Sequence, residues 1–253
     1  SSRRGHRAIG AGAGRDVRKT RACPSRHWIA QPGPEGFRIL PRMVPTPARI
    51  LPMLRFDAVP ELVKDRLDEL SSRGLDEFAL GGGTSLALRM GHRISVDLDF
   101  FTEAVFSPEE LFEEIALADA TIIKNARNTL ALNANGVKVE FLRHAYPVLA
   151  PVENMDGIRM LSLPDVAAMK LKAIANRGSK KDFYDVVELL EHHTLPQLLD
   201  FFASKYRASD PFTVIRSLVW FEDAEQEPDP VSMAGKTWED VKVRVIAAMG
   251  DLI

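Results

Sequence analysis

Three acidic residues on two expected strands have the types and the spacing for chemistry. Asp97 and Asp99 are one residue apart in an alternating segment at 94–101, so both carboxylates project from one face of a strand. Glu140 is in the sequence Val-Lys-Val-Glu-Phe at 137–141, where the apolar residues face the other way. Carboxylate oxygens suit Mg²⁺ that bridges nucleotide phosphates, and two such ions ~3.5–4 Å apart clamp an in-line displacement. The pattern predicts metal-assisted chemistry at a phosphate.

A glycine-rich turn precedes these acids. Gly82 and Gly83 follow a short apolar segment at 78–80 and precede an expected helix at 84–90, and thirteen residues separate them from Asp97. Glycines at such a turn let the backbone approach a phosphate, which then meets free N–H groups and the positive end of the helix dipole. The run contains neither Gly-Lys-Ser/Thr nor Gly-x-Gly-x-x-Gly, so it supports neither a P-loop nor a Rossmann site.

An isolated Asp-x-Asp is more often a solvated strand face, because charged residues are mostly exposed. Three features favour a site here. The opposite face of the 94–101 segment is apolar, the glycine turn lies upstream at a workable spacing, and a third acid stands on a strand that could pair with the first.

A basic segment follows in a chain that is otherwise acidic. Residues 166–181 contain five basic residues and no acid: Lys170, Lys172, Arg177, Lys180 and Lys181. Lys170 and Arg177 are seven residues apart and share a helix face, while Asp182 and Asp185 lie one turn apart on the next expected helix. The cluster suits triphosphate or RNA backbone charge. The alternative is a basic surface loop in which Asp182 is the N-terminal dipole partner of its helix.

Together these motifs resemble the nucleotidyltransferases of the AbiEii/AbiGii toxin family, within the DNA polymerase beta-like superfamily. The resemblance covers about residues 50–200 and rests on the segments 82–101, 137–141 and 169–185, in that order. Aspartate is the more usual third acid of the family. Glu140 is longer by one methylene, which puts the number of well-held metal ions in question.

The resemblance implies a transfer of a nucleotidyl group from an NTP to an acceptor hydroxyl, with RNA (tRNA) as the expected acceptor. Such an enzyme would be the toxin of a toxin–antitoxin or abortive-infection system, with an antitoxin encoded nearby. Mg²⁺ would be held by Asp97, Asp99 and Glu140. The expected catalytic residues are Asp97, Asp99, Glu140, Lys170 and Asp182. The expected nucleotide-binding residues are Gly82, Gly83, Thr84, Ser85, Arg177 and Asp185.

Several roles stay open at this stage. Either Asp99 or Glu140 would activate the acceptor hydroxyl, and either Asp182 or Asp185 would position Arg177 or a substrate group. His92 and Arg93 either lock the turn between helix and strand or face the substrate. Two other functions compete with the main one: nucleotidylation of a small hydroxyl compound, as in antibiotic-modifying relatives, and a nucleotide-binding module without catalysis.

The elements that must position these residues form an α/β (α+β) pattern, a mixed β-sheet flanked by helices and followed by a helical bundle. We expect a nucleotidyltransferase core at 44–163 and a helical domain at 164–253. Asn135-Gly136 predicts a hairpin turn. Ser107 with Glu110, and Thr237 with Asp240, predict capping boxes. After an amphipathic helix from Pro60 to Gly74, further helices are expected at 107–117, 165–176, 182–192, 195–206, 211–220 and 238–249, and further strands at 121–123, 129–133 and 137–142.

Charge is unevenly distributed along the 253 residues. The formal net charge of −2 divides into +8 for residues 1–43, with ten basic and two acidic side chains, and −10 for residues 44–253. We expect 1–43 to be a disordered basic tail. It could contact nucleic acid, serve as a transit-like presequence, or be translated upstream sequence with initiation at Met43 or Met53.

The only cysteine, Cys23, excludes an intramolecular disulfide and a cysteine-based zinc site, which fits a reducing cytoplasm. The sequence contains no apolar run near the ~18 residues of a membrane span and no apolar core of a secretory signal. We therefore expect a soluble cytoplasmic protein without a membrane partner.

Overall fold

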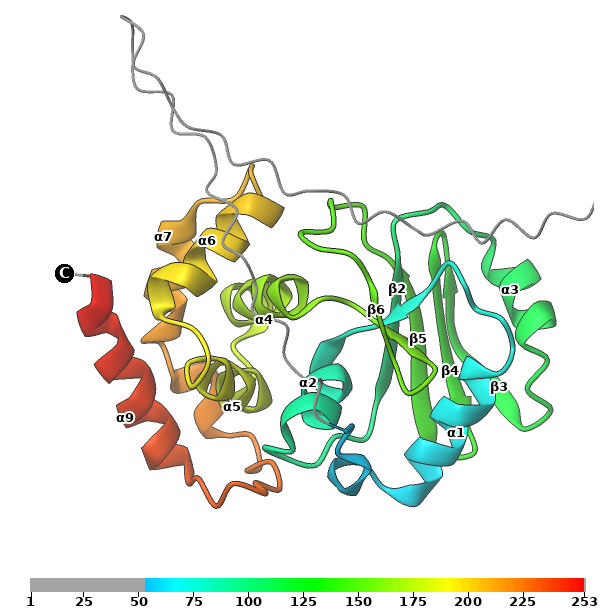
Figure 1. Ribbon diagram of the computed structural model, residues 1–253, viewed down its shortest axis with the longest axis horizontal. Coiled ribbons are helices and arrows are strands. Elements are labelled where there is room, and N and C mark those ends of the chain that lie inside the picture. Colours follow the sequence, from blue (N-terminus) through cyan, green and yellow to red (C-terminus); the bar gives the residue numbers. More distant parts are fainter. Residues whose placement is uncertain (1–52, 253) are drawn as a thin grey trace, which may run out of the picture. The chain divides into compact units, whose positions relative to one another are not determined.

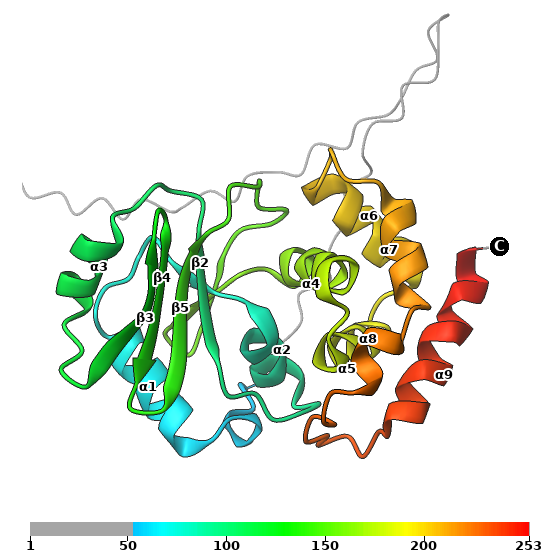
Figure 2. The ribbon, with the colours of Figure 1, turned by 180° about the vertical axis from the view of Figure 1, so that it is seen from behind.

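A computed structural model describes residues 53–252, so the basic tail expected at 1–43 lies outside the described residues. In the described part, seven strands form one sheet in the order β3-β4-β5-β2-β1-β7-β6 (Figures 1 and 2). The strands are β1 (Ala79–Leu80), β2 (Leu98–Thr102), β3 (Ala120–Ala126), β4 (Thr129–Ala134), β5 (Val137–Arg143), β6 (Glu153–Met155) and β7 (Ile158–Met160).

The sheet mixes parallel and antiparallel pairs. Strands β3, β4 and β5 form an antiparallel meander, and β2 pairs parallel to β5. Strand β1 runs antiparallel to β2 and parallel to β7. The predicted hairpin turn joins β4 to β5: Asn135 and Gly136 have φ values of 52° and 87°, as a two-residue turn with both residues in the left-handed region requires.

One face of the sheet is covered by α1 (Glu61–Ser71) and α3 (Pro108–Ile115), as Figure 1 shows. The apolar stripe of α1 meets the even-numbered residues of β2 and the odd-numbered residues of β5 in one core, and the rings of Phe100 and Phe141 stack there at 5.2 Å. This leaves Asp99 and Glu140 on the opposite face.

On the opposite face, α2 (Gly82–Met90) packs on β2, and α4 (Leu163–Arg177) and α5 (Lys180–Leu189) pack on α2 (Figures 1 and 2). The later helices α6 (Leu195–Lys205), α7 (Pro211–Leu218), α8 (Glu222–Glu225) and α9 (Trp238–Met249) share a second core with α4 and α5. Short 3₁₀ helices cover Phe56–Ala58 and Gly250–Leu252. All described regular structure from Leu163 onward is helical, and the division into two domains at residue 163 stays a prediction.

Residues 94–97 differ from the expected strand, because β2 begins only at Leu98. The amide of Ile94 donates to Val231 and that of Ser95 donates to Ala58, so these backbone groups bond outside the sheet. Two elements were not predicted: the β6–β7 hairpin and helix α8.

The two predicted capping boxes have different outcomes. Thr237 and Asp240 form both reciprocal hydrogen bonds at the start of α9. At α3 only half of the box forms: Ser107 accepts from the Glu110 amide but donates its own hydroxyl to Glu109. None of the helices in residues 53–252 has the length and apolar character that crossing a bilayer demands.

Candidate active site

Asp99 and Glu140 lie on the face of the sheet that α2 covers, and Asp97 lies close enough for its charge to act on Asp99. Asp99 on β2 and Glu140 on β5 are register partners across the parallel pair, so their side chains stand next to each other. Asp97 precedes β2 by one residue. The side chains of Asp97 and Glu140 are 34% and 24% exposed, so both carboxylates are partly open to solvent. The expected pairing of the two strands is confirmed.

Asp99 is the innermost acid of the three. Burial raises the pKa of its carboxyl above the ordinary value, and the neighbouring charges of Glu140 and Asp97 raise it further. Lys170 and Lys138 oppose this rise. Asp99 therefore stands in a position where added positive charge would be favourable.

The glycine turn lies against this acid. Gly82 opens α2 with φ +63°, and a Cβ at this position would overlap with Oδ2 of Asp99. A Cβ on Gly83 would overlap with Nη2 of Arg93. No side-chain cap of α2 is found in the described structure, so the first N–H groups of the helix remain free for a ligand. The backbone thus approaches Asp99 at Gly82 and Arg93 at Gly83 closely only because these positions lack a side chain.

Thr84 and Ser85, expected to bind nucleotide, have buried side chains. The Thr84 hydroxyl donates to the carbonyl of Asp97 and lies 2.8 Å from the hydroxyl of Ser95. The Ser85 hydroxyl accepts from Nη1 of Arg89 at 2.7 Å. Both hydroxyls hold protein groups in place, so a nucleotide contact at these positions stays a prediction for the backbone N–H groups.

A buried ion cluster forms around Asp185 on α5. Arg93 donates to both carboxylate oxygens at 2.7 and 2.9 Å, and Nε2 of His92 and Nζ of Lys170 each lie 2.7 Å from the carboxylate. Burial alone would raise the pKa of the Asp185 carboxyl. The charges of Arg93 and Lys170 outweigh this effect and hold the pKa well below its usual range. His92 and Arg93 are buried and contact Asp185. The geometry therefore supports the role in which they hold the turn between helix and strand in place, rather than the role in which they face the substrate.

Asp182 holds Arg177 from the start of α5. The Arg177 guanidinium donates to both of its oxygens at 2.8 and 3.0 Å, and Lys170 donates to one of them at 3.0 Å. Arg177 remains 56% exposed, whereas Lys170 is buried between Asp182 and Asp185. Of the two acids proposed to position Arg177, Asp182 does so. Lys170 contacts carboxylates in this structure, and its expected contact with phosphate stays a prediction.

Two lysines neutralise the outer acids. Lys138 Nζ lies 2.6 Å from Glu140 Oε2, and Lys181 Nζ lies 3.5 Å from Asp97 Oδ2. Sequence reasoning did not identify these pairs. The period of two along β5 was the available signal for Lys138, because it puts this lysine on the same face as Glu140.

The donor set fits a hard divalent cation. Three carboxylates supply only oxygen ligands. Burial is the main cause that raises the pKa of Asp99, and the charges of Glu140 and Asp97 add to it, so a bound cation would stabilise the charged carboxylate. Within residues 53–252, no group of three or more His, Cys, Asp or Glu side chains is already gathered around one point. The metal roles of Asp97, Asp99 and Glu140 therefore stay a prediction that their chemistry supports.

A family model described as nucleotidyl transferase AbiEii toxin of type IV toxin–antitoxin systems matches residues 67–149 and 130–244. The chain belongs to this family. An uncharacterized protein of Aquifex aeolicus (strain VF5) is 39% identical over 176 residues, which are 65% of this chain and 84% of that protein. The resemblance stated from the sequence is confirmed, and this member of the AbiEii family is a nucleotidyltransferase.

This AbiEii-family chain is also similar to solved structures. MenT4, a nucleotidyltransferase toxin of Mycobacterium tuberculosis H37Rv, has a TM-score of 0.53 at 18% identity, covering 78% of this chain and 85% of its own. JHP933 of Helicobacter pylori has a TM-score of 0.48 at 19% identity, covering 79% and 94%. The predicted nucleotidyltransferase fold, with its mixed sheet and flanking helices, is confirmed.

Proposed function

We propose that this AbiEii-family enzyme uses Mg²⁺ to transfer a nucleotidyl group from an NTP to an acceptor hydroxyl on RNA, and that it acts as the toxin beside an antitoxin partner. The observation that carries the proposal is the register pairing of Asp99 with Glu140 directly against the glycine start of α2. Paired carboxylates next to an uncapped helix N-terminus bring together metal ligands and a phosphate cradle.

The nucleotide would lie with its phosphates at the start of α2. The free N–H groups at Gly82 and Gly83 and the helix dipole favour an anion there. The exposed Arg177 supplies a planar pair of donors for phosphate oxygens, and Asp182 fixes its orientation. Lys181 and Lys138 would exchange their carboxylate partners for phosphate oxygens when the nucleotide binds.

Asp97, Asp99 and Glu140 would hold the metal ion. Mg²⁺, when bound there, supplies positive charge that stabilises the oxygens of the reacting phosphate. In the transfer, the acceptor hydroxyl oxygen bonds to the α-phosphorus while the bond from this phosphorus to pyrophosphate breaks. The hydroxyl proton passes to a carboxylate oxygen of Asp99 or Glu140.

The buried ion cluster has a supporting role in this proposal. Asp185 joins the turn before β2 to α5 through Arg93, and Lys170 joins α4 to both acids of α5. These contacts hold Arg177 and the glycine turn in one arrangement, and fixed donors stabilise developing charge without reorganisation.

A second candidate acceptor is a small cationic hydroxyl compound. The charge of −10 on residues 44–253 favours a cationic acceptor over a long phosphate chain. The same assay distinguishes the two, because the label appears either on RNA or on the small compound.

The test uses the purified full chain with each α-labelled NTP, Mg²⁺, total tRNA and a set of small amino alcohols. We expect label on RNA, and a loss of about a hundredfold or more in Asp97→Asn, because the oxygen of the amide no longer carries the charge that a metal ligand needs. Asp65→Asn, an exposed acid of α1, is the matched control and should label at the native rate. Labelling by Asp97→Asn at the rate of the native chain would contradict the proposed site. Label that is found only on a small hydroxyl compound would identify the second candidate acceptor.

A further inference from the structure

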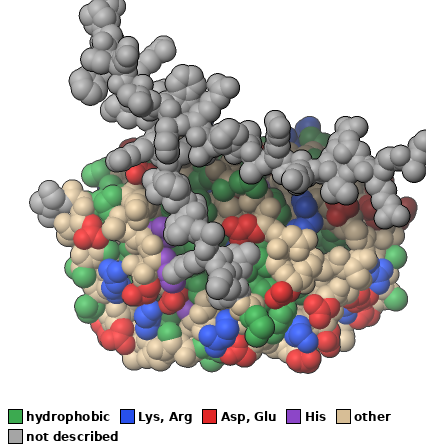
Figure 3. All heavy atoms as spheres, viewed as in Figure 1, with side chains coloured by type: hydrophobic (Ala, Val, Ile, Leu, Met, Phe, Trp, Pro, Cys, Tyr) green, Lys and Arg blue, Asp and Glu red, His purple; other side chains and the backbone are tan. Residues whose placement is uncertain are grey.

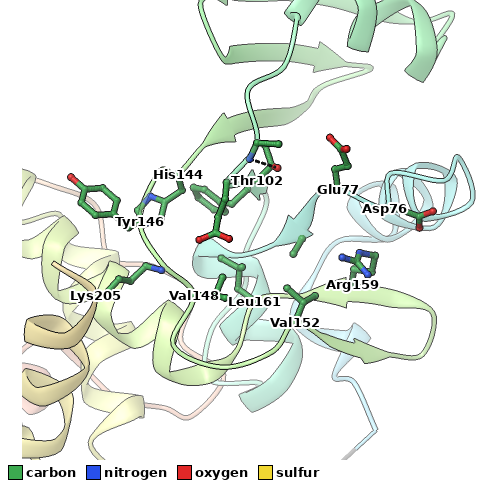
Figure 4. A pocket seen from close by; sticks show the side chains of 14 residues that line it. Asp76, Glu77, Thr102, His144, Tyr146, Val148, Val152, Arg159, Leu161 and Lys205 are labelled. Carbon is green, nitrogen blue, oxygen red and sulfur yellow. Dashed lines mark hydrogen bonds between the residues drawn. The ribbon is translucent and has the colours of Figure 1, made fainter. Parts of the chain in front are cut away.

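A cavity opens where β2 ends, away from the three acids (Figure 4). Its volume is about 330 Å³, at the lower end of the range of roughly 300–1,000 Å³ for ligand pockets, so it suits a small ligand. Phe101, two residues after Asp99 on the same face of β2, lies in its wall. Its apolar and aromatic wall is made by Phe101, His144, Tyr146, Val148, Val152 and Leu161. None of the predicted site residues lines it.

An aromatic corner forms one side of this cavity. The His144 ring lies 4.9 Å from Tyr146, 5.9 Å from Phe101 and 5.8 Å from Tyr206, centroid to centroid. Nε2 of His144 is 3.2 Å from the Tyr206 hydroxyl. Burial and the nearby Lys205 charge lower the pKa of His144 to about 4, so the imidazole is neutral at pH 7. This corner presents aromatic faces without positive charge.

The opposite side of the cavity is acidic. Figure 4 shows Asp76 and Glu77 across the cavity from His144 and Tyr146. Glu103 also lines the cavity, and all three carboxylates belong to exposed residues. Arg159 is the exposed cation among the lining residues, and its Nε donates to the carbonyl of Phe78. The exposed groups of the lining therefore sum to a negative charge.

Lys205 does not offset this charge. Its Nζ lies 2.7 Å from Oδ1 of Asp165 and donates to the carbonyl of Pro147 at 3.1 Å, and the side chains of both ion-pair partners are buried. The ammonium is thus neutralised by the protein itself. A ligand anion would meet three carboxylates against the exposed guanidinium of Arg159, whereas a ligand cation would meet an excess of carboxylates together with uncharged rings.

We propose that this cavity binds a small organic cation, an ammonium or guanidinium group on a short carbon chain. The cation would lie over the faces of Tyr146 and the neighbouring rings, which attract positive charge through their quadrupoles. Glu77 and Glu103 would add charge complementarity at the rim. The methylene groups would contact Val148, Val152 and Leu161.

Calorimetric titration of the full chain tests this site with agmatine and spermidine as probes and 1,4-butanediol as the uncharged counterpart. Both amines should bind and the diol should not. Glu103→Gln and Tyr146→Ala should each weaken the amines by roughly two- to fivefold. Binding should weaken further at high salt, because the rim carboxylates are exposed. Glu61→Gln, an exposed acid outside the cavity, is the control and should bind amines like the native chain.

Several results would overturn this proposal. These are an absence of amine binding, equal binding of the diol, and amine binding that is unchanged in Glu103→Gln and Tyr146→Ala. Unchanged melting temperatures establish that the variants are folded, and Tyr146→Phe should restore the native affinity because the ring face is kept. Asp97→Asn should bind amines with the native affinity, because Asp97 is outside the cavity. The result of this titration is therefore independent of the result of the nucleotidyl-transfer assay.

Discussion

At the scale of single residues, Gly82 and Asp99 constrain each other. The left-handed φ of Gly82 and the missing Cβ both bring the start of α2 against the Asp99 carboxylate. A glycine in this place therefore serves the acid as well as an incoming phosphate. Spacing alone predicted the second role, because the first depends on how the two strands are placed in space.

Gly82→Ala tests this relation. The new Cβ meets Oδ2 of Asp99 and the left-handed backbone adds a strain of about 1–2 kcal/mol, so we expect lower stability together with a strong loss of nucleotidyl transfer. Gly74→Ala is the matched control, because Gly74 has φ +72° with no atom near its Cβ position. It should lose comparable stability and keep its activity. Equal activity losses in the two variants, measured alongside urea unfolding, would show that strain alone acts at Gly82.

The residue types and their spacing predicted the acids, but not the charges that face them. The period of two on a strand placed Asp99 and Glu140 on the face away from the α1 core, whereas Asp97 lies just before the strand. Lys181 was not predicted as the partner of Asp97, because it reaches this acid from a helix more than eighty residues later in the chain. Long-range pairs of this kind leave no local pattern in a sequence.

At the scale of elements, the carboxylate of Asp185 connects three parts of the fold: α5, α4 and the segment before β2. Asp185 on α5 binds Arg93, which precedes β2, and Lys170 on α4. The side chains of all three residues are less than 7% exposed, so removing the central charge leaves the buried Arg93 without a carboxylate partner and leaves Lys170 with Asp182 alone.

Asp185→Asn should lower the free energy of unfolding by about 3–5 kcal/mol at pH 7. The pKa of Asp185 is lower in the folded than in the unfolded chain, so its contribution is present above the unfolded value near 4 and is lost as pH falls through the folded value. Urea unfolding below pH 4 should therefore bring the native and variant proteins together. Asp57→Asn, which removes the partner of Arg55 in an ion pair that is exposed on both sides, is the control and should leave the free energy of unfolding nearly unchanged. A gap between the native protein and Asp185→Asn that stays constant down to acid pH would contradict this account.

Long elements with clear periodicity were predicted well, and short ones were not. The helices at 163–177 and 238–249 and the 137–143 strand lie close to their predicted positions. The strands of the β6–β7 hairpin have three residues each, which is too short to show a period of two in the sequence. The Asp156-Gly157 turn between them was a usable signal. The apolar alternation at 94–97 was misleading, because these residues bond to segments outside the sheet.

At the scale of the whole molecule, charge is distributed rather than gathered on the face seen in Figure 3. Acidic and basic side chains alternate over the visible part of that face. The fold class could be predicted from the order of the expected elements. The cavity at the end of β2 could not, because its lining comes from the start of β1 and the ends of β2, β5 and α6. Only the three-dimensional arrangement brings these ends together.

The central claim is that the acids of β2 and β5 serve nucleotidyl transfer, and comparison of α-labelled with γ-labelled NTP tests it most directly. We expect that the acceptor gains the α-label and no γ-label while pyrophosphate is released in equal amount, and that Asp99→Asn abolishes both events. Transfer of the γ-label would show a phosphoryl transfer instead. Transfer of the α-label at the native rate by Asp99→Asn would contradict the assignment of the site.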